Sequence, residues 1–444
     1  MFQVLRNAWV DVQLRKKILY TLFIIILFRL GSNIFVPFID SAAVGEMVKG
    51  VSLLNYLDVM TGGSLGKGTL LAMSITPYIN ASIIIQLLTV ALPPLEKLSK
   101  EGDVGRKKLN MITKITALAI ATFQAIAFYF TLSNSDTNGD GTGNPVLKYC
   151  AANGSDTFSI VLAAIVIVSC FVAGAFLIIW LGDRINEKGL GNGISMILFA
   201  GIISNLPSAV EYFVKLCMSD MKNIIWVLLT IILFIALVWF VIMMTNAERR
   251  IPVQYAKRVV GRKMYGGQST HIPIKVAMAG VMPIIFAMSL MSLPQTICYF
   301  FGIDGRGDTF WDGFVRLFSQ QSVLYAIIYF VLIIAFNYFY VSIQYNPVEI
   351  ANNLKKNNGA IPGYRPGKPT SDFIYNSLNK ITLIGAMFLG IIAVFPIVLA
   401  LCVPSMAGVS LGGTTLLIVV SVSLETVRSL ESQMMMRHHK GFLE

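Results

Sequence analysis

The chain has 444 residues, of which 55% are hydrophobic and only 13% are charged. Soluble domains carry about 25% charged residues, so the composition excludes a soluble protein and indicates an all-α protein that crosses a membrane several times. The formal net charge of +12 does not require a nucleic-acid partner, because Lys and Arg gather on the cytoplasmic loops of membrane proteins.

Residues 1–17 are predicted to form a small amphipathic helix on the cytoplasmic surface of the membrane. Apolar residues recur at steps of three and four from Phe2 to Val12, with basic residues around them, which is typical of surface helices. A first span follows at about 18–36 and is uncleaved, because no small-residue cleavage site follows it. Arg29 lies inside this span, where an arginine is costly, and we expect a structural role for it.

The stretch 58–95 predicts a broken helix. A glycine-rich run, 61–68, precedes an apolar segment, 69–75, that is too short to cross a bilayer. Pro77 follows and either bends or starts a helix, because proline lacks an N–H donor. Irregular backbone at membrane depth is tolerated only inside protein or beside a water-filled cavity, so the stretch points to a cavity with a short movable segment. The residues alone fit equally well with a re-entrant loop that only packs, or with a loop outside the membrane.

Apolar segments predict about ten membrane spans in all. Their approximate bounds are 18–36, 75–95, 110–132, 157–181, 191–211, 223–244, 272–300, 322–344, 372–397 and 410–435. With the amino terminus inside, about 24 of the 35 Lys and Arg fall in cytoplasmic segments and about 7 in the opposite loops. We therefore expect both termini to be cytoplasmic. The spans are expected to form two pseudo-symmetric halves of five, 18–211 and 212–435, around a central pore, followed by a tail, 436–444, although no internal repeat is visible.

Two cytoplasmic loops, 245–271 and 346–371, are too long and too charged to be simple connectors. Apolar and polar residues alternate over 251–260, which predicts strands or a hairpin. Pro and Gly residues in the second loop predict rigid turns. Both loops are predicted docking surfaces for a large partner. The alternative is that their charges only anchor the loops on the cytoplasmic side.

Five ordered stretches carry a resemblance to a known family. They are ITPYINASIIIQLL (75–88), WLGDRINEKGLGNGIS (180–195), the arginine-rich loop 249–258, the loop from NLKK to PGYRPG (353–367) and GGTTLLI (412–418). Read together, they resemble the SecY family, whose members form the channel of the bacterial or plastid Sec protein translocase. The resemblance covers essentially the whole chain.

The resemblance implies a passive protein-conducting channel in the cell membrane. Such a channel moves unfolded secretory chains across the membrane and releases transmembrane segments sideways into lipid through a lateral gate, formed on one side by the helix after Pro77. It implies that residues 58–74 form a plug, a short helix that closes the resting channel on its outer side. The plug residues to which we assign this role are Thr61, Gly62, Gly63, Ser64, Leu65, Leu70 and Leu71.

The resemblance also implies a ring of apolar side chains at the waist of the channel. Carried onto this chain, the ring is Ile79, Ile83, Ile194, Leu198, Ile285 and Ile418, with leucine at 198 where isoleucine is usual. The spacing agrees, because residues four apart share one face of a helix, and apolar constrictions gate by dewetting. Without the resemblance, such pairs are as readily explained as packing or lipid-facing residues.

The resemblance further implies partners and an external source of energy. SecE and SecG are the expected small membrane subunits, and the SecA motor ATPase and the ribosome are the expected docking partners. Signal peptides, unfolded secretory chains and membrane lipid complete the expected set. The residues expected to contact the motor or the ribosome are Arg249, Arg250, Lys257, Arg258, Lys355, Lys356 and Arg365.

The sequence carries no motif for catalysis or for a cofactor, and we expect neither an enzyme nor a metal site. The run from Gly62 to Lys67 imitates a phosphate-binding loop but has the wrong glycine spacing. The run 136–141 imitates a calcium loop, but Leu147 stands where a glutamate ligand is required. A secondary transporter for small solutes is the main rival class; the scarcity of charge inside the spans counts against it.

Overall fold

The computed structural model describes most of the chain. It covers residues 9–50, 61–134, 157–219, 221–255, 258–260, 263–265, 269–300, 322–402 and 413–438, together with positions 6, 54, 58, 313, 315, 317 and 318. The predicted docking residue Lys257 and the calcium-like run 136–141 lie outside the described residues. So do most of the predicted surface helix before residue 9 and the tail after His438.

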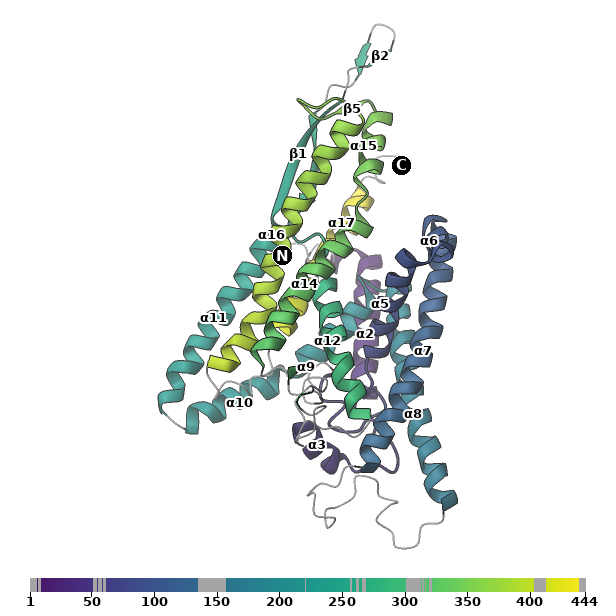
Figure 1. Ribbon diagram of the computed structural model, residues 1–444, viewed down its shortest axis with the longest axis vertical. Helices are drawn as coiled ribbons and strands as arrows, with labels where there is room; N and C mark the ends of the chain where they lie inside the picture. The colour runs from purple at the N-terminus through teal and green to yellow at the C-terminus, as the bar shows by residue number, and fades with distance from the viewer. Residues whose placement is uncertain are drawn as a thin grey trace.

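The described chain is mostly helical, as the composition predicts (Figure 1). The long helices are Val12–Gly31 (α2), Thr76–Ala91 (α5), Asp103–Asn134 (α7), Thr157–Lys188 (α8), Gly193–Ser204 (α9), Leu206–Ser219 (α10), Met221–Asn246 (α11), Met282–Phe300 (α12), Val323–Gln344 (α14), Lys368–Cys402 (α16) and Gly413–His438 (α17). The short ones are Ser41–Gly50 (α3), Pro93–Lys100 (α6) and Pro347–Lys356 (α15).

Six helices in the described ranges are long and apolar enough to cross a membrane. A seventh is added if α5 and α6, which meet at an angle of 101°, count as one span. This confirms a membrane protein with several spans. The predicted number of about ten stays a prediction, although a helix overlaps each predicted span.

Two predicted boundaries near the ends of the first span are wrong. Helix α2 already begins at Val12, so residues 12–17 continue into the first span and do not belong to a separate surface helix. The cause is Asp11, whose side chain accepts a hydrogen bond of 2.8 Å from the backbone N–H of Gln13 and so caps the helix there. The helix ends at Gly31, before the predicted end at 36.

The two predicted docking loops form a small antiparallel sheet, as the alternation predicts. Strand β1 (Glu248–Tyr255) pairs with β4 (Ser269–Lys275) on one side and, at its end, with β5 (Gly359–Ala360) on the other. Strands β2 (Arg258–Val260) and β3 (Lys263–Tyr265) form a separate hairpin. The buried side chains Ile251 and Val253 pack with residues of α15 and α16, so the two predicted docking loops form one folded unit.

The predicted start of the span at 272–300 is also wrong. The stretch begins in strand β4, and helix α12 begins only at Met282. Ile272 and Ile274 belong to strand β4, which pairs with β1. In the sequence, this apolar stretch runs on toward the apolar helix α12, so a hydropathy pattern reads both as one segment. Hydropathy alone does not separate a buried strand from a helix start.

The helices of each predicted half pack mainly on one another. Helix α7 packs on α5 and α8, and α14 packs on α12 and α16. Between the halves, α9 contacts α17, while α12 contacts α5 and α7. The sheet and α15 lie at one end of the molecule, and α3 lies at the opposite end (Figure 1). The division into halves and their symmetry both stay predictions.

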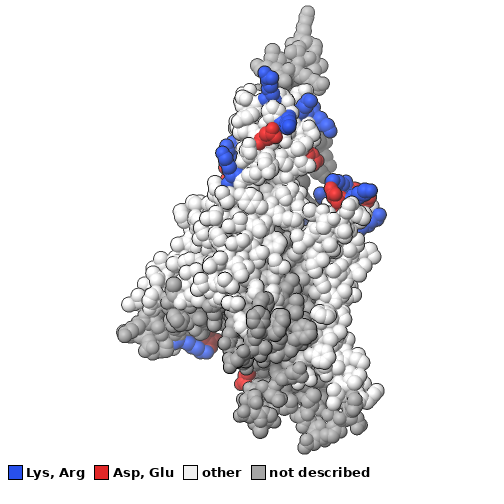
Figure 2. All heavy atoms as spheres, in the orientation of Figure 1, with Lys and Arg blue, Asp and Glu red and all other residues white. Residues whose placement is uncertain are grey.

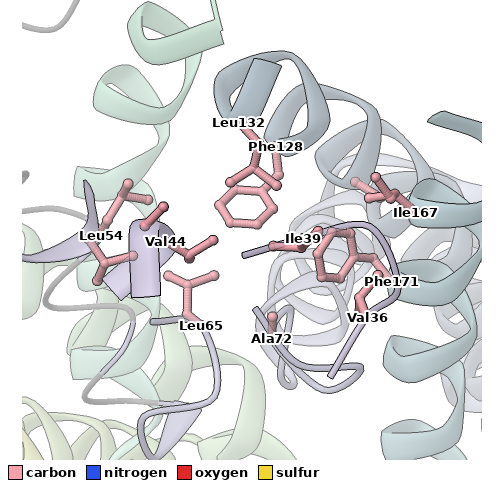
Figure 3. Packing of buried hydrophobic residues seen from close by; sticks show 13 residues of the cluster. Val36, Ile39, Val44, Leu54, Leu65, Ala72, Phe128, Leu132, Ile167 and Phe171 are labelled. Carbon is pink, nitrogen blue, oxygen red and sulfur yellow. The ribbon is translucent and has the colours of Figure 1, made fainter. Parts of the chain in front are cut away.

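An apolar core lies at the end occupied by α3. It joins the loop residues Val36, Ile39 and Leu65 to Phe128 of α7 and Phe171 of α8 (Figure 3). The two phenylalanine rings meet edge to face, with centroids 5.4 Å apart, a favourable aromatic geometry. This core fixes the segments on either side of α3 against the helices.

Candidate functional site

Residues 61–75, here called the turn segment, do not form the helix that the sequence predicts. Position 61 is helical, but 62–75 is a series of turns, and α5 begins at Thr76 with Pro77 in its first turn. Two hydrogen bonds explain the difference, because they tie the segment to the chain after α2. The Leu70 N–H donates to the carbonyl of Ile34 at 2.8 Å, and the Val36 N–H donates to the carbonyl of Gly68 at 3.1 Å.

The turn segment is buried against three helices. Leu70 and Leu71 pack in an apolar cluster with residues of α2, α8 and α9. A side chain at Gly174 of α8 would overlap the carbonyl oxygen of Leu70, so glycine is what allows the segment to approach α8. The predicted plug residues Thr61, Gly62, Ser64 and Leu65 are also buried.

Asp58 fixes the fold of the turn segment. Its carboxylate accepts a hydrogen bond of 2.6 Å from the N–H of Gly66, and its carbonyl accepts one of 2.9 Å from the N–H of Gly63. Burial raises the pKa of Asp58 above its ordinary value of 3.8, against the opposing effect of its backbone hydrogen bonds and of Lys67. The sequence alone does not single out this residue.

Five of the six predicted ring residues lie in two neighbouring apolar clusters. Ile79, Ile194 and Leu198 belong to the cluster that holds Leu70 and Leu71. Ile285 and Ile418 belong to a second cluster, between α9, α12 and α17. The sixth, Ile83, is buried but belongs to neither cluster.

Met196 of α9 joins the two clusters and is absent from the predicted ring. It packs against both of them, and its sulfur lies 3.4 Å from the hydroxyl of Thr426 on α17. The contact lies between the predicted halves. The methionine carries no sequence signal that would distinguish it from an ordinary packing residue.

A cavity of about 650 Å³ lies beside these clusters. Leu198, Ile285 and Ile418 form part of its wall. The wall also includes charged and polar residues from several elements, namely Asn192, Ser195, Thr245, Lys275, Glu425 and Arg428. Three of the six predicted ring residues thus stand beside a space with a partly polar wall.

The charged residues of this cavity are connected to the sheet. Arg428 of α17 donates hydrogen bonds to the carbonyl of Thr245 at 3.0 Å and to the side chain of Asn246 at 2.7 Å. Burial, and secondarily the charge of Arg428, lowers the pKa of Lys275, while Glu248 and Glu425 act in the opposite direction. The cavity wall and the base of the sheet therefore share one set of charges.

The predicted docking residues that the structure describes lie on the surface of the sheet, of α15 and of the loop between β5 and α16. The side chains of Arg249, Arg250, Lys355, Lys356 and Arg365 are exposed, and basic side chains gather at this end of the molecule (Figure 2). Arg258 is placed only by its backbone, in β2. Arg250 pairs with Glu248 at 2.7 Å.

Comparison with known proteins identifies the family. The SecY family model matches residues 69–427. The protein translocase subunit SecY of Thermotoga maritima is 38% identical over 451 residues, covering 100% of this chain and 98% of its own. That of Mycobacterium tuberculosis is 40% identical over 450 residues, covering 98% of each chain.

The fold agrees with solved structures. One, reported as the structure of a protein conducting channel, has a TM-score of 0.64 at 19% identity and covers 95% of this chain and 93% of its own. Another, concerned with the plug domain of the SecY protein, has a TM-score of 0.62 at 19% identity over the same shares. The chain therefore belongs to the SecY family.

Proposed function

We propose that the chain is the channel-forming subunit of a protein translocase in the cell membrane. It conducts unfolded secretory chains across the membrane and catalyses no reaction. The observation that carries the proposal is the pair of apolar clusters, joined at Met196, between the buried turn segment and the partly polar cavity.

The ring residues form the waist of the channel. Aliphatic side chains make no sequence-specific hydrogen bonds, so they close around many different chains, and an apolar constriction without a chain resists ions by dewetting. The positions of Leu198, Ile285 and Ile418 on the cavity wall support this role. Ile79, Ile83 and Ile194 complete the ring.

Residues 58–74 act as the plug, and α5 acts as one wall of the lateral gate. The burial of the turn segment against α2, α8 and α9 supports the proposal that the plug occupies its closed position, its seat, in this structure. The contacts of α12 with α5 and α7 are those that a lateral opening would break.

The sheet and α15 dock the external motor and the ribosome. The exposed basic side chains at this end support the proposal, since charge complementarity speeds association with an acidic partner surface. With this end in the cytoplasm, both termini are cytoplasmic. SecA and the ribosome are the proposed docking partners, and SecE and SecG the proposed membrane subunits.

Photocrosslinking tests the proposed channel. A crosslinker is placed at Ile83 or Ile418, and a secretory chain is stalled during export in membrane vesicles. Ile235 of α11, which is 63% exposed, serves as the control position facing away from the waist. Adducts at the two ring positions but not at Ile235 are expected. Equal labelling at all three, or none at either ring position in an inserted protein, would reject the waist.

A further inference from the structure

Arg29 lies near the end of α2, within the predicted first span. A cation in a span is costly and is normally paired or directed into protein. The side chain is half-buried, and no ion pair in the described ranges involves it. Its charge is therefore stabilised in another way.

The guanidinium bonds to the turn segment. Nη1 of Arg29 donates to the carbonyl oxygen of Gly62 at 3.1 Å and to the hydroxyl of Ser32 at 3.3 Å. The Ser32 hydroxyl donates to the Arg29 carbonyl at 2.8 Å, which holds the serine in place. A hydrogen bond from a charged donor is stronger than one between neutral groups.

The last turn of α9 also lies close to Gly62 and Arg29. Gly62 has a φ of +74°, and a Cβ added to it would lie 2.6 Å from the Ser204 hydroxyl, 2.9 Å from the Gly201 carbonyl oxygen and 3.1 Å from Nη1 of Arg29. The guanidinium thus stands beside the last turn of α9.

We propose that Arg29 is a positioning residue that holds the plug in its closed seat. The inference rests on the proposed function, because it takes residues 58–74 as the plug. When the plug leaves its seat, the bond to Gly62 is lost, whereas the bond to Ser32, which directly follows α2, can remain. The interaction therefore favours the closed state over the open one.

Lys67 provides a matched control within the plug. It is also a cation, but it is exposed, and its ammonium lies 3.4 Å from the side-chain oxygen of Asn33. Exposed polar contacts of this kind contribute little. Loss of Lys67 removes one positive charge, whose effect on Asp58 is the smallest of those that act on its pKa, and it removes no buried hydrogen bond.

The test uses Ser64→Cys as a reporter. Ser64 is 1% exposed, and its hydroxyl has no hydrogen-bond partner among the described residues, so a thiol fits there. Vesicles carrying the complete translocase are treated on the outer side with a membrane-impermeant maleimide. The chain without the reporter gives the background from native cysteines, and the same vesicles are assayed for resting ion conductance and for export.

Arg29→Gln is expected to raise the labelling rate about 10- to 100-fold, the range for loss of a hydrogen bond to a charged group, and to raise resting conductance, with export retained. Lys67→Gln is expected to leave both unchanged. Wild-type labelling in Arg29→Gln, or an equal rise in Lys67→Gln, would overturn the inference. If deletion of 60–72 also leaves conductance unchanged, the plug assignment fails; if that deletion leaks, only the role of Arg29 fails.

Discussion

Arg428 of α17 donates a hydrogen bond of 2.7 Å to the side chain of Asn246, the last residue of α11. Strand β1 begins two residues later, at Glu248. The base of the sheet is therefore fixed to α17, which lines the cavity. Neither partner stands out in the sequence, since the two are far apart in it.

Arg428→Leu is expected to slow motor-driven export about tenfold while resting conductance stays at the wild-type level. The substitution removes both bonds to the end of α11, each worth about 1.5–3 kcal/mol before solvent exposure is considered. Export into inverted vesicles measures the effect. Lys188→Leu, which removes an exposed cation at the end of α8, is the control, and an equal loss there would contradict the explanation.

Arg365→Glu is expected to stop motor-driven export without unfolding the protein. Its side chain is exposed, and the loop is held by its main chain, whose carbonyl accepts a bond of 2.8 Å from the Thr370 hydroxyl. Exposed substitutions usually change stability by about 0.5 kcal/mol or less. Export rate and thermal unfolding are measured together, and Arg365→Lys is the control. Normal export with glutamate would remove Arg365 from the docking surface.

Deletion of residues 60–72 is expected to make the resting membrane permeable to ions, because it removes the segment buried against α2, α8 and α9. Single-channel recording in planar bilayers measures the conductance. A closed channel after this deletion would show that the ring alone seals the pore.

Gly174→Ala is expected to raise resting conductance and to destabilise the closed state by about 1–3 kcal/mol, the usual effect of overpacking. The new methyl group would overlap backbone, the carbonyl of Leu70, which moves only with the plug. In Gly390→Ala the methyl group meets the ring of Phe330, at 2.6 Å, and a side chain can turn away. Similar leakage in both variants would contradict a specific effect on the plug.

Acidification of the outer side is expected to favour the closed plug. Burial raises the pKa of Asp58 above 3.8 in the closed plug, and we expect this pKa to fall when displacement of the plug exposes the carboxyl group to water. Between these two values the seated plug binds more protons, so the stabilisation is present at low pH and is lost as pH rises through the raised pKa.

Asp58→Asn is the matched variant for this pH dependence. The side-chain oxygen of asparagine can still accept the hydrogen bond from the Gly66 N–H. The asparagine amide, unlike the aspartate carboxyl group, does not titrate at acidic pH. Resting conductance should therefore fall with acidification in the wild-type protein and stay constant in the variant. An unchanged slope in the variant would assign the titration to another group.

The sequence predicts the helices better than the segments between them. Long apolar runs such as that of α11 are recognised as membrane helices from hydropathy alone. The alternation of apolar and polar residues from Ile251 onward predicts strand β1. The turn segment is not predicted correctly, because its shape depends on bonds to Ile34 and Val36. Such long-range pairing has no local signal.

The ring is predicted from resemblance and not from physical pattern, whereas the two docking loops are predicted from their length and charge and only their individual docking residues from resemblance. Residues four apart, such as Ile194 and Leu198, satisfy helix packing as well as a pore. Asp58, Met196 and the bond from Arg29 to Gly62 emerge only when distant segments are placed together.

The joint at Met196 has a chemical consequence. A thioether is flexible and polarisable, which suits a side chain that packs against two clusters at once, but it is also oxidised to a polar sulfoxide. In Met196 the added oxygen would enter the contact between both apolar clusters. The barrier to ions is therefore expected to weaken under oxidative stress and to recover when methionine sulfoxide reductase restores the side chain.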